Sequence, residues 1–170
     1  MSRQITTFSV ADTLLGLDIL IVKEVYRHMD LTPVPDAPPH MSGLMNLRGR
    51  VVTVVDFGAC LNLVKEEPHE KKLLIMKTNA EILKYQQKGL LADVSLGDDI
   101  VGFLIDDMDE VLTVEDEDVL PTPPNLDTVD RQLIEGVVKL KNKLVLILDI
   151  NAILERILSL STSTGEQAKK

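Results

Sequence analysis

The side chains most able to do chemistry are gathered in one acidic stretch of the chain. Residues 93–118 hold eleven aspartates and glutamates and no lysine or arginine. A calcium-binding loop of the EF-hand type needs a glycine at its sixth position, and counting from Asp107 places Leu112 there. We therefore expect no EF-hand, and we interpret the stretch as solvated turns and strand faces or as a surface that meets a basic partner.

Other groups that could catalyse a reaction or bind a metal are isolated from one another. His28, His40 and His69 each lack a second histidine or cysteine at ligand spacing, so surface-loop positions and no metal site are predicted. Cys60 is the single cysteine and is expected to be a small core residue. The sequence contains neither a phosphate-binding glycine motif nor a G-x-S-x-G elbow. An enzyme is thus disfavoured, and no cofactor is predicted.

One polar pair among apolar neighbours remains. Glu24 follows Val22 in an apolar run, and Arg48 belongs to the Asn-Leu-Arg-Gly stretch over 46–49. A planar guanidinium suits a bidentate contact with a carboxylate. The pair is open to two interpretations, a salt bridge that closes a β-barrel or a direct contact with a partner. Gly49 would permit the positive-φ turn that must follow Arg48.

The elements that position these groups belong to a duplicated unit. Residues 43–61 and 136–154 align without gaps, offset by 93 residues and identical at six of nineteen positions. Residues 7–25 echo residues 93–111, and a proline-rich link follows each of these earlier stretches. Three matches in the same order predict an internal repeat.

Each unit is predicted to be mostly β. Expected strands are 5–10, 14–17, 50–55, 100–105 and 143–148. The strands 14–17 and 100–105 are expected as second strands of hairpins, and turn residues before 50–55 and 143–148 predict two further hairpins. Asp56 and Asp149 are predicted helix N-caps, since the residues after them do not match an aspartic-protease pair. Units of about five short strands tend to close into barrels, because closure removes exposed edges.

Two segments lie outside the repeat. The linker over 65–89 is expected to contain one further strand, 73–76, and a helix with Asn79 as N-cap and Gly89 as C′. The end of the chain, 159–170, is predicted to be a disordered tail. The repeats themselves are placed at about 5–61 and 91–154.

Charge and hydropathy limit the partners. The formal net charge is −9, which disfavours binding to nucleic acid. No apolar stretch reaches the length of a membrane span, and no leader-like segment follows Met1, so a soluble cytoplasmic protein without membrane insertion is expected.

At these residues the sequence resembles the CheW family of chemotaxis coupling proteins. The resemblance covers residues 4–158, and its most specific part is the Asn-Leu-Arg-Gly stretch. It implies two similar five-stranded, SH3-like β-barrels with short helices. It also implies a non-catalytic adaptor between the cytoplasmic tips of methyl-accepting chemoreceptors and the regulatory domain of a CheA-type histidine kinase, within arrays at the inner face of the membrane.

The resemblance also carries over site residues. Val22 and Glu24 match positions near a receptor groove between the barrels, Arg48 matches the motif arginine, and Gly43 and Asn46 shape the same turn. The linker is longer than usual for the family, and no receiver domain follows. Two alternatives remain: the regulatory domain of a kinase or a scaffold of a pilus or other pathway, and, from another class, a small metal-binding β-barrel protein.

Overall fold

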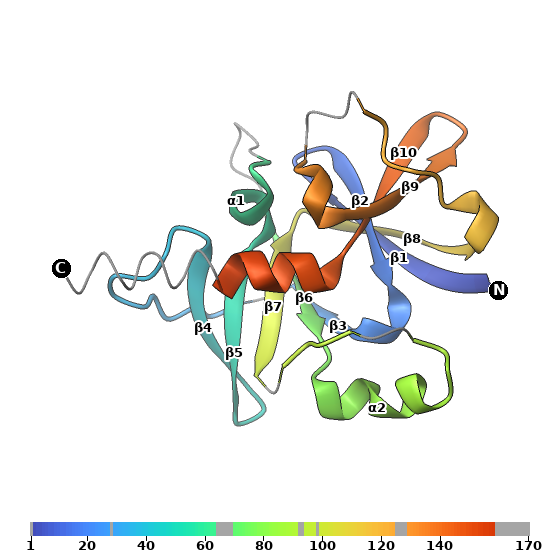
Figure 1. The fold of residues 1–170 in the computed structure, drawn as a ribbon. Coiled ribbons are helices and arrows are strands. Elements are labelled where there is room, and N and C mark those ends of the chain that lie inside the picture. The colour runs from blue at the N-terminus through green and yellow to red at the C-terminus, as the bar shows by residue number, and fades with distance from the viewer. Residues whose placement is uncertain are drawn as a thin grey trace.

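Ten β-strands form two five-stranded sheets in the part of the chain that the structure describes (Figure 1). The structure is a computed structural model and describes residues 2–27, 29–63, 70–91, 94–97, 99–124 and 129–158. Sheet A has the order β8 (Asp107–Glu115), β1 (Ser2–Val10), β2 (Thr13–Asp18), β10 (Lys143–Leu148) and β9 (Ile134–Leu140). Sheet B has the order β3 (Val22–Tyr26), β6 (Lys72–Met76), β7 (Ile100–Ile105), β5 (Arg50–Asp56) and β4 (Met41–Leu47). The prediction of a mostly β fold with two five-stranded units is confirmed.

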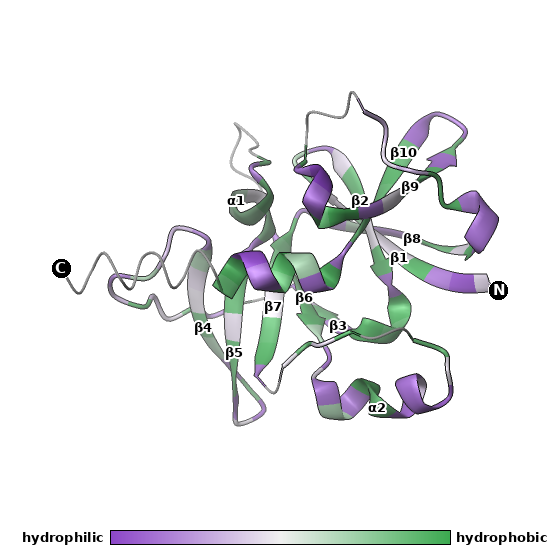
Figure 2. Cartoon of the chain, in the orientation of Figure 1, coloured by the Kyte–Doolittle hydropathy of each residue, from purple (hydrophilic) through white to green (hydrophobic). Residues whose placement is uncertain are grey.

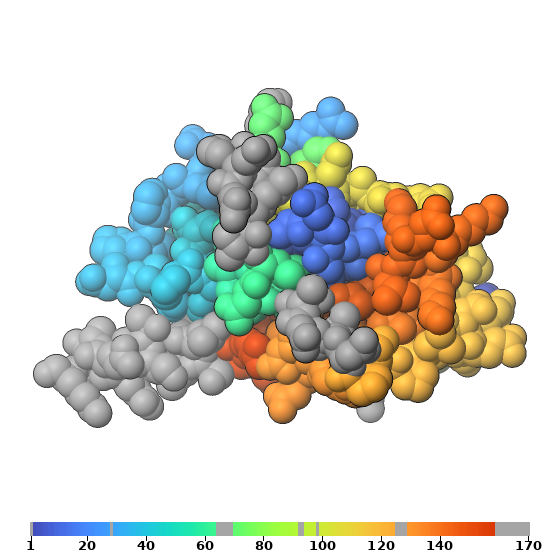
Figure 3. Space-filling model, turned by 90° about the horizontal axis from the view of Figure 1, so that it is seen from above, coloured from blue at the N-terminus to red at the C-terminus, as the bar shows by residue number. Residues whose placement is uncertain are grey.

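Each sheet exchanges strands with the other half of the sequence. The β1–β2 hairpin of the first half pairs with β8 and β10 of the second, and β6 and β7 pair with β3 and β5 of the first. The two sheet orders superimpose when β8, β1, β2, β10 and β9 are matched to β3, β6, β7, β5 and β4. The duplication is therefore visible in the topology, but a sheet is not one sequence repeat. Figure 3 shows the blue N-terminal residues lodged between the cyan first half and the orange second half.

The exchange corrects one predicted hairpin. β7 was expected to follow its partner directly, but it pairs antiparallel with β6, on the far side of a helix. The linker of the sequence analysis thus supplies β6, a strand inside sheet B. The hairpins β4–β5 and β9–β10 form as predicted.

Short helices fill the connections. They are α1 (Phe57–Leu61), α2 (Asn79–Gln87), residues 150–158, and the 3₁₀ turns η1 (Ile19–Ile21), η2 (Asp116–Asp118) and η3 (Arg131–Leu133). Asp56 accepts from the backbone N–H of Ala59 and Asp149 from that of Ala152, so both predicted N-caps are confirmed. None of the described helices is both long enough and apolar enough to span a membrane. The predicted tail lies outside the described residues.

The predicted cap of α2 is wrong by one residue. Thr78 is the N-cap, and its backbone N–H donates to the Glu81 carboxylate in a capping box. Asn79 instead accepts from the N–H of Leu96 at 2.7 Å and ties the helix to the segment before β7. Gly89 follows the helix with φ +71°, as predicted for a C′ glycine.

Alternating side chains along the strands divide the apolar residues among three clusters. In β10, Val145 and Ile147 point into the sheet A cluster, whereas Leu146 and Leu148 join a larger cluster shared by both sheets. In β6, Leu73 belongs to the separate cluster of sheet B. This period of two is what places both sheet faces in apolar surroundings. Figure 2 shows that the strands β6, β7 and β10 are largely hydrophobic.

Candidate functional site

The Glu24 and Arg48 side chains meet in the structure. Arg48 Nη1 donates to Glu24 Oε1 at 3.1 Å and Nη2 donates to Oε2 at 3.3 Å, which makes the predicted bidentate contact. Nη2 also donates to the hydroxyl of Tyr26 at 2.6 Å. One guanidinium therefore holds two acceptors that lie two residues apart on β3.

A tight turn presents Arg48 to its partners. Arg48 and Gly49 both have positive φ, +52° and +83°, which is the backbone of a type I′ hairpin turn between β4 and β5. Asn46 Oδ1 accepts from the N–H of Gly49 at 3.0 Å. Asn46 thus fixes the turn and Gly49 permits it, while neither contacts Glu24 directly in the part of the chain described.

The pair connects the two edge strands of sheet B. Glu24 lies on β3 and Arg48 follows β4, and these strands are at opposite ends of the sheet. Beyond β3, Thr32 makes two backbone hydrogen bonds with Leu44 of β4, of 2.8 and 2.9 Å. Gly43 allows this approach, because a Cβ there would lie 2.6 Å from the Thr32 carbonyl oxygen. The barrel-closing interpretation of the pair therefore agrees with its geometry.

The pair is also open to solvent. The Arg48 side chain is 67% exposed and that of Glu24 is 26% exposed. The hydrogen bond to Glu24 raises the pKa of Arg48 above its ordinary value, so the guanidinium stays charged at any physiological pH. Water screens such a pair, so its stabilising effect on the fold is small and its exposed donors remain accessible.

Two residues change the predicted site. Val22 begins β3 and packs, half-buried, against the cluster shared by both sheets, whereas Tyr26 packs against the cluster of sheet B. Tyr26 was not among the predicted site residues, although it contacts Arg48 more closely than Glu24 does. The period of two along a strand was the signal for it, because Glu24 and Tyr26 share one face of β3.

The equivalent place in sheet A holds a hollow of mixed polar and apolar lining. Under the strand matching, Glu24, Tyr26 and Arg48 correspond to Glu110, Leu112 and Lys141, and the described structure has no ion pair between Glu110 and Lys141. Leu112, Val138 and Leu140 instead line a hollow of about 430 Å³, together with the charged residues Glu117, Asp118 and Lys139. Leu120 closes this sheet through backbone bonds to Val137, as Thr32 does in sheet B.

The other chemically active residues have structural surroundings. His40 is buried, with 3% of its surface exposed, which corrects the prediction of a surface histidine, and burial lowers its pKa. His28 and His69 lie outside the described residues. Cys60 is buried as predicted, and burial raises the pKa of its thiol to about 11, which keeps it protonated and unreactive.

The acidic stretch is partly engaged within the protein. Asp107 pairs with Lys72, whose hydrogen bond lowers the pKa of the carboxyl, and Asp106 accepts from the N–H of Ala11 at 2.7 Å. Asp118 accepts from the N–H of Glu115 in the η2 capping box. Among the described residues no group of three or more potential ligands is placed to hold a metal ion.

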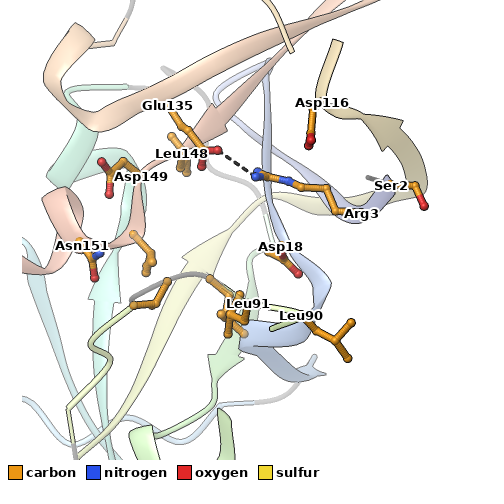
Figure 4. Close-up of a pocket in the computed structure, with 13 residues that line it drawn as sticks. Ser2, Arg3, Asp18, Leu90, Leu91, Asp116, Glu135, Leu148, Asp149 and Asn151 are labelled. Atoms are coloured by element: carbon orange, nitrogen blue, oxygen red, sulfur yellow. Dashed lines mark hydrogen bonds and ion pairs between the residues drawn. The ribbon is translucent and has the colours of Figure 1, made fainter. Parts of the chain in front are cut away.

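A second hollow, of about 270 Å³, lies where the start of β1 meets the end of β10 and the residues Leu90, Leu91 and Val94. Figure 4 shows Arg3 and Glu135 meeting across it, with Asp18 and Asp116 beside them. The Arg3–Glu135 contact is 2.9 Å, and burial raises the pKa of Asp18. Its arginine is thus already paired, and the contact joins β1 to β9.

Comparisons with known proteins agree over most of the chain. A family model described as CheW-like domain matches residues 4–158. The chain is 27% identical over 151 residues to a chemotaxis protein CheW of Rhizobium meliloti, covering 89% of this chain and 86% of that protein. It is 28% identical over 154 residues to the chemotaxis protein CheW of Bacillus subtilis, covering 91% and 88%. The crystal structure of a scaffolding protein, TtCheW from Thermoanaerobacter tengcongensis, matches with a TM-score of 0.71 and 27% identity over 90% of this chain and 88% of that one.

Proposed function

The chain belongs to the CheW-like domain family, and from that premise we propose that it is a non-catalytic adaptor of a chemosensory array. In this role it couples the cytoplasmic tip of a methyl-accepting chemoreceptor to the regulatory domain of a CheA-type histidine kinase. The proposed location is therefore the cytoplasmic side of the membrane, at receptor arrays.

The observation that carries the proposal is the Arg48–Glu24 contact on an exposed barrel edge, within a chain of this family. A solvent-accessible guanidinium held rigidly by two acceptors is suited to orienting a partner. A receptor tip is a helical hairpin, and a surface with apolar walls and a polar rim suits helix binding. Val22, half-buried near the start of the same strand, is a candidate apolar wall.

Kinase binding would use a different part of the molecule. The regulatory domain of such kinases has a similar fold by the family resemblance, so contacts between barrels are the expected mode. Exposed apolar residues near the sheet A hollow, Leu120 and Leu144, are the candidates that the structure offers. Individual contacts of this kind need only modest affinity, because an array multiplies them.

The test is recovery of both partners and their separate titration. The tagged full chain is used to capture proteins from the native cell extract at low salt. The recovered kinase's regulatory domain and the recovered receptor's cytoplasmic fragment are then each titrated with purified chain by calorimetry. Saturable binding to both is the expected result, and binding to neither would overturn the proposal.

A further inference from the structure

Tyr26 is the second residue that accepts a hydrogen bond from Arg48, beside Glu24, and the family resemblance did not point to it. Its ring packs, half-buried, against the sheet B cluster, and its hydroxyl accepts from Arg48 Nη2 at 2.6 Å. The guanidinium carbon lies 5.8 Å from the centre of the ring. The packed ring therefore holds the hydroxyl at a fixed place on the surface beside the charge.

A count of donors and acceptors shows what this surface offers to a partner. Arginine has five N–H groups, and three of those of Arg48 are directed at Glu24 and Tyr26. The remaining Nη1–H and the Nε–H make no contact with any described residue. The hydroxyl of Tyr26 accepts from Arg48, so its own hydrogen is available to donate. Both oxygens of Glu24 already accept from the guanidinium.

The charge around the turn also favours a partner that carries negative charge. Arg50 lies two residues after Arg48, is exposed and forms no ion pair with the described residues. The charges of Glu24 and Arg48 balance each other, so Arg50 adds a positive charge to the turn. Although the whole chain is acidic, this corner of sheet B presents donors and positive charge.

We propose that Tyr26 is a specificity-determining residue, whose hydroxyl donates to a carboxylate of the partner that also accepts from a free N–H of Arg48. The partner is then a helical segment that presents a glutamate or aspartate to this corner. The inference rests on the proposed adaptor function and adds to it the chemistry that the receptor side must provide. A carboxylate has the acceptor sites to bind both donors at once.

The test removes only the hydroxyl. Tyr26→Phe is compared with the wild-type chain in calorimetric titrations against the recovered receptor's cytoplasmic fragment and against the kinase regulatory domain. Tyr85→Phe is the matched control, because Tyr85 is the other tyrosine of the chain and also contacts a lysine, Lys77, through its hydroxyl. We expect Tyr26→Phe to weaken receptor binding about 5-fold and to leave kinase binding unchanged. Tyr85→Phe should leave the binding of both partners unchanged.

A double-mutant cycle identifies the carboxylate. Each acidic residue of the receptor tip is changed to its amide, and one such change should weaken the binding of Tyr26→Phe less than it weakens wild-type binding, because only the contact with Arg48 remains to be lost. Additive effects at every acidic position would overturn the carboxylate assignment. Equal affinities of Tyr26→Phe and wild type would overturn the role of Tyr26 and leave the adaptor function standing. Failure of the wild-type chain to bind receptor and kinase would overturn both.

Discussion

The same duplicated framework is closed with a polar side-chain contact in one sheet and without one in the other. In sheet B the edge strands β3 and β4 are joined by Glu24, Tyr26 and Arg48. In sheet A the matching strands β8 and β9 carry Leu112 and Leu140 around an open hollow. The backbone closure is nearly identical in the two, a pair of hydrogen bonds from Thr32 or Leu120 to the opposite edge.

The difference shows that the fold requires the backbone contacts at the closure and leaves the side chains there open to variation. Both barrels close through backbone bonds, so side chains at the closure are free to vary. Sheet B uses that freedom for a rigid, charged and exposed arginine, and sheet A uses it for a hollow lined by both apolar and charged side chains. The two barrels thus present different surfaces at their matching edges.

The largest expected effect concerns the glycines that allow each closure. Gly43→Ala places a Cβ 2.6 Å from a backbone oxygen at a residue with φ +149°. At Gly136 the Cβ would lie 2.6 Å from a Val119 methyl carbon and 2.9 Å from the Leu120 carbonyl oxygen, but the residue has no positive φ. We expect Gly43→Ala to lower the free energy of unfolding by about 3 kcal/mol and Gly136→Ala by about 1 kcal/mol. Urea denaturation followed by circular dichroism measures both, and equal losses would show that the two closures tolerate crowding alike.

The next effect concerns partner binding. Arg48→Ala removes an exposed side chain whose loss the fold tolerates, so we expect receptor affinity to fall about 10-fold with little change in thermal stability. Lys141→Ala is the matched control in sheet A, where no described pair is broken, and should leave receptor affinity unchanged. Normal binding by Arg48→Ala would assign the pair to barrel closure alone.

A smaller effect distinguishes the two sheets by pH. His40 and Leu133 are equivalent, since each carbonyl accepts from the N–H of the matched aspartate, Asp56 or Asp149. Burial lowers the pKa of His40, so the unfolded chain binds the proton more readily and stability falls as pH decreases below about 6.5. His40→Leu should raise the melting temperature at pH 5.5 by about 3 °C and by less at pH 7.5. A rise of the same size at both values would exclude titration of His40 as the cause.

The smallest effect comes from transferring the polar closure. The double substitution L112Y/K141R gives sheet A the side chains of sheet B, and Glu110 is already in place. We expect a new ion pair with Glu110 and a change in melting temperature of about 1 °C or less, because an exposed pair is screened. A crystal structure of the variant tests the geometry, and Glu110→Gln in the same background tests the pair.

Much of this comparison was present in the sequence. The glycines at 43 and 136 and the aspartates at 56 and 149 matched because each repeat needs the same close approach and the same helix cap. The Glu24–Arg48 pair could be predicted from residue types and the turn that follows. Features of this kind can be predicted from short stretches of sequence, because one or two contacts decide each of them.

The remainder depended on contacts between distant residues. The sequence of residues 100–105 fits a hairpin with the residues just before it as well as it fits pairing with β6, which precedes α2 in the chain. The burial of His40 follows from packing around β4 and β5, and histidine alone does not indicate it. Tyr26 was not predicted as a site residue, since its contact with Arg48 depends on a turn twenty-two residues further along.

The exchange of strands between the sheets governs how the molecule can form and be divided. β2 must pair with β10, Leu15 beside Leu146, before sheet A is whole, so no ribosome-bound first half can complete either barrel. Such distant pairings slow folding and leave strand edges exposed until the chain is finished. The same architecture makes the two halves interdependent pieces, and fragments cut between α1 and β6 should reassemble only with each other. If the chain were divided there between the two parts of a split reporter, a signal would appear only when the halves bind each other and complete both sheets.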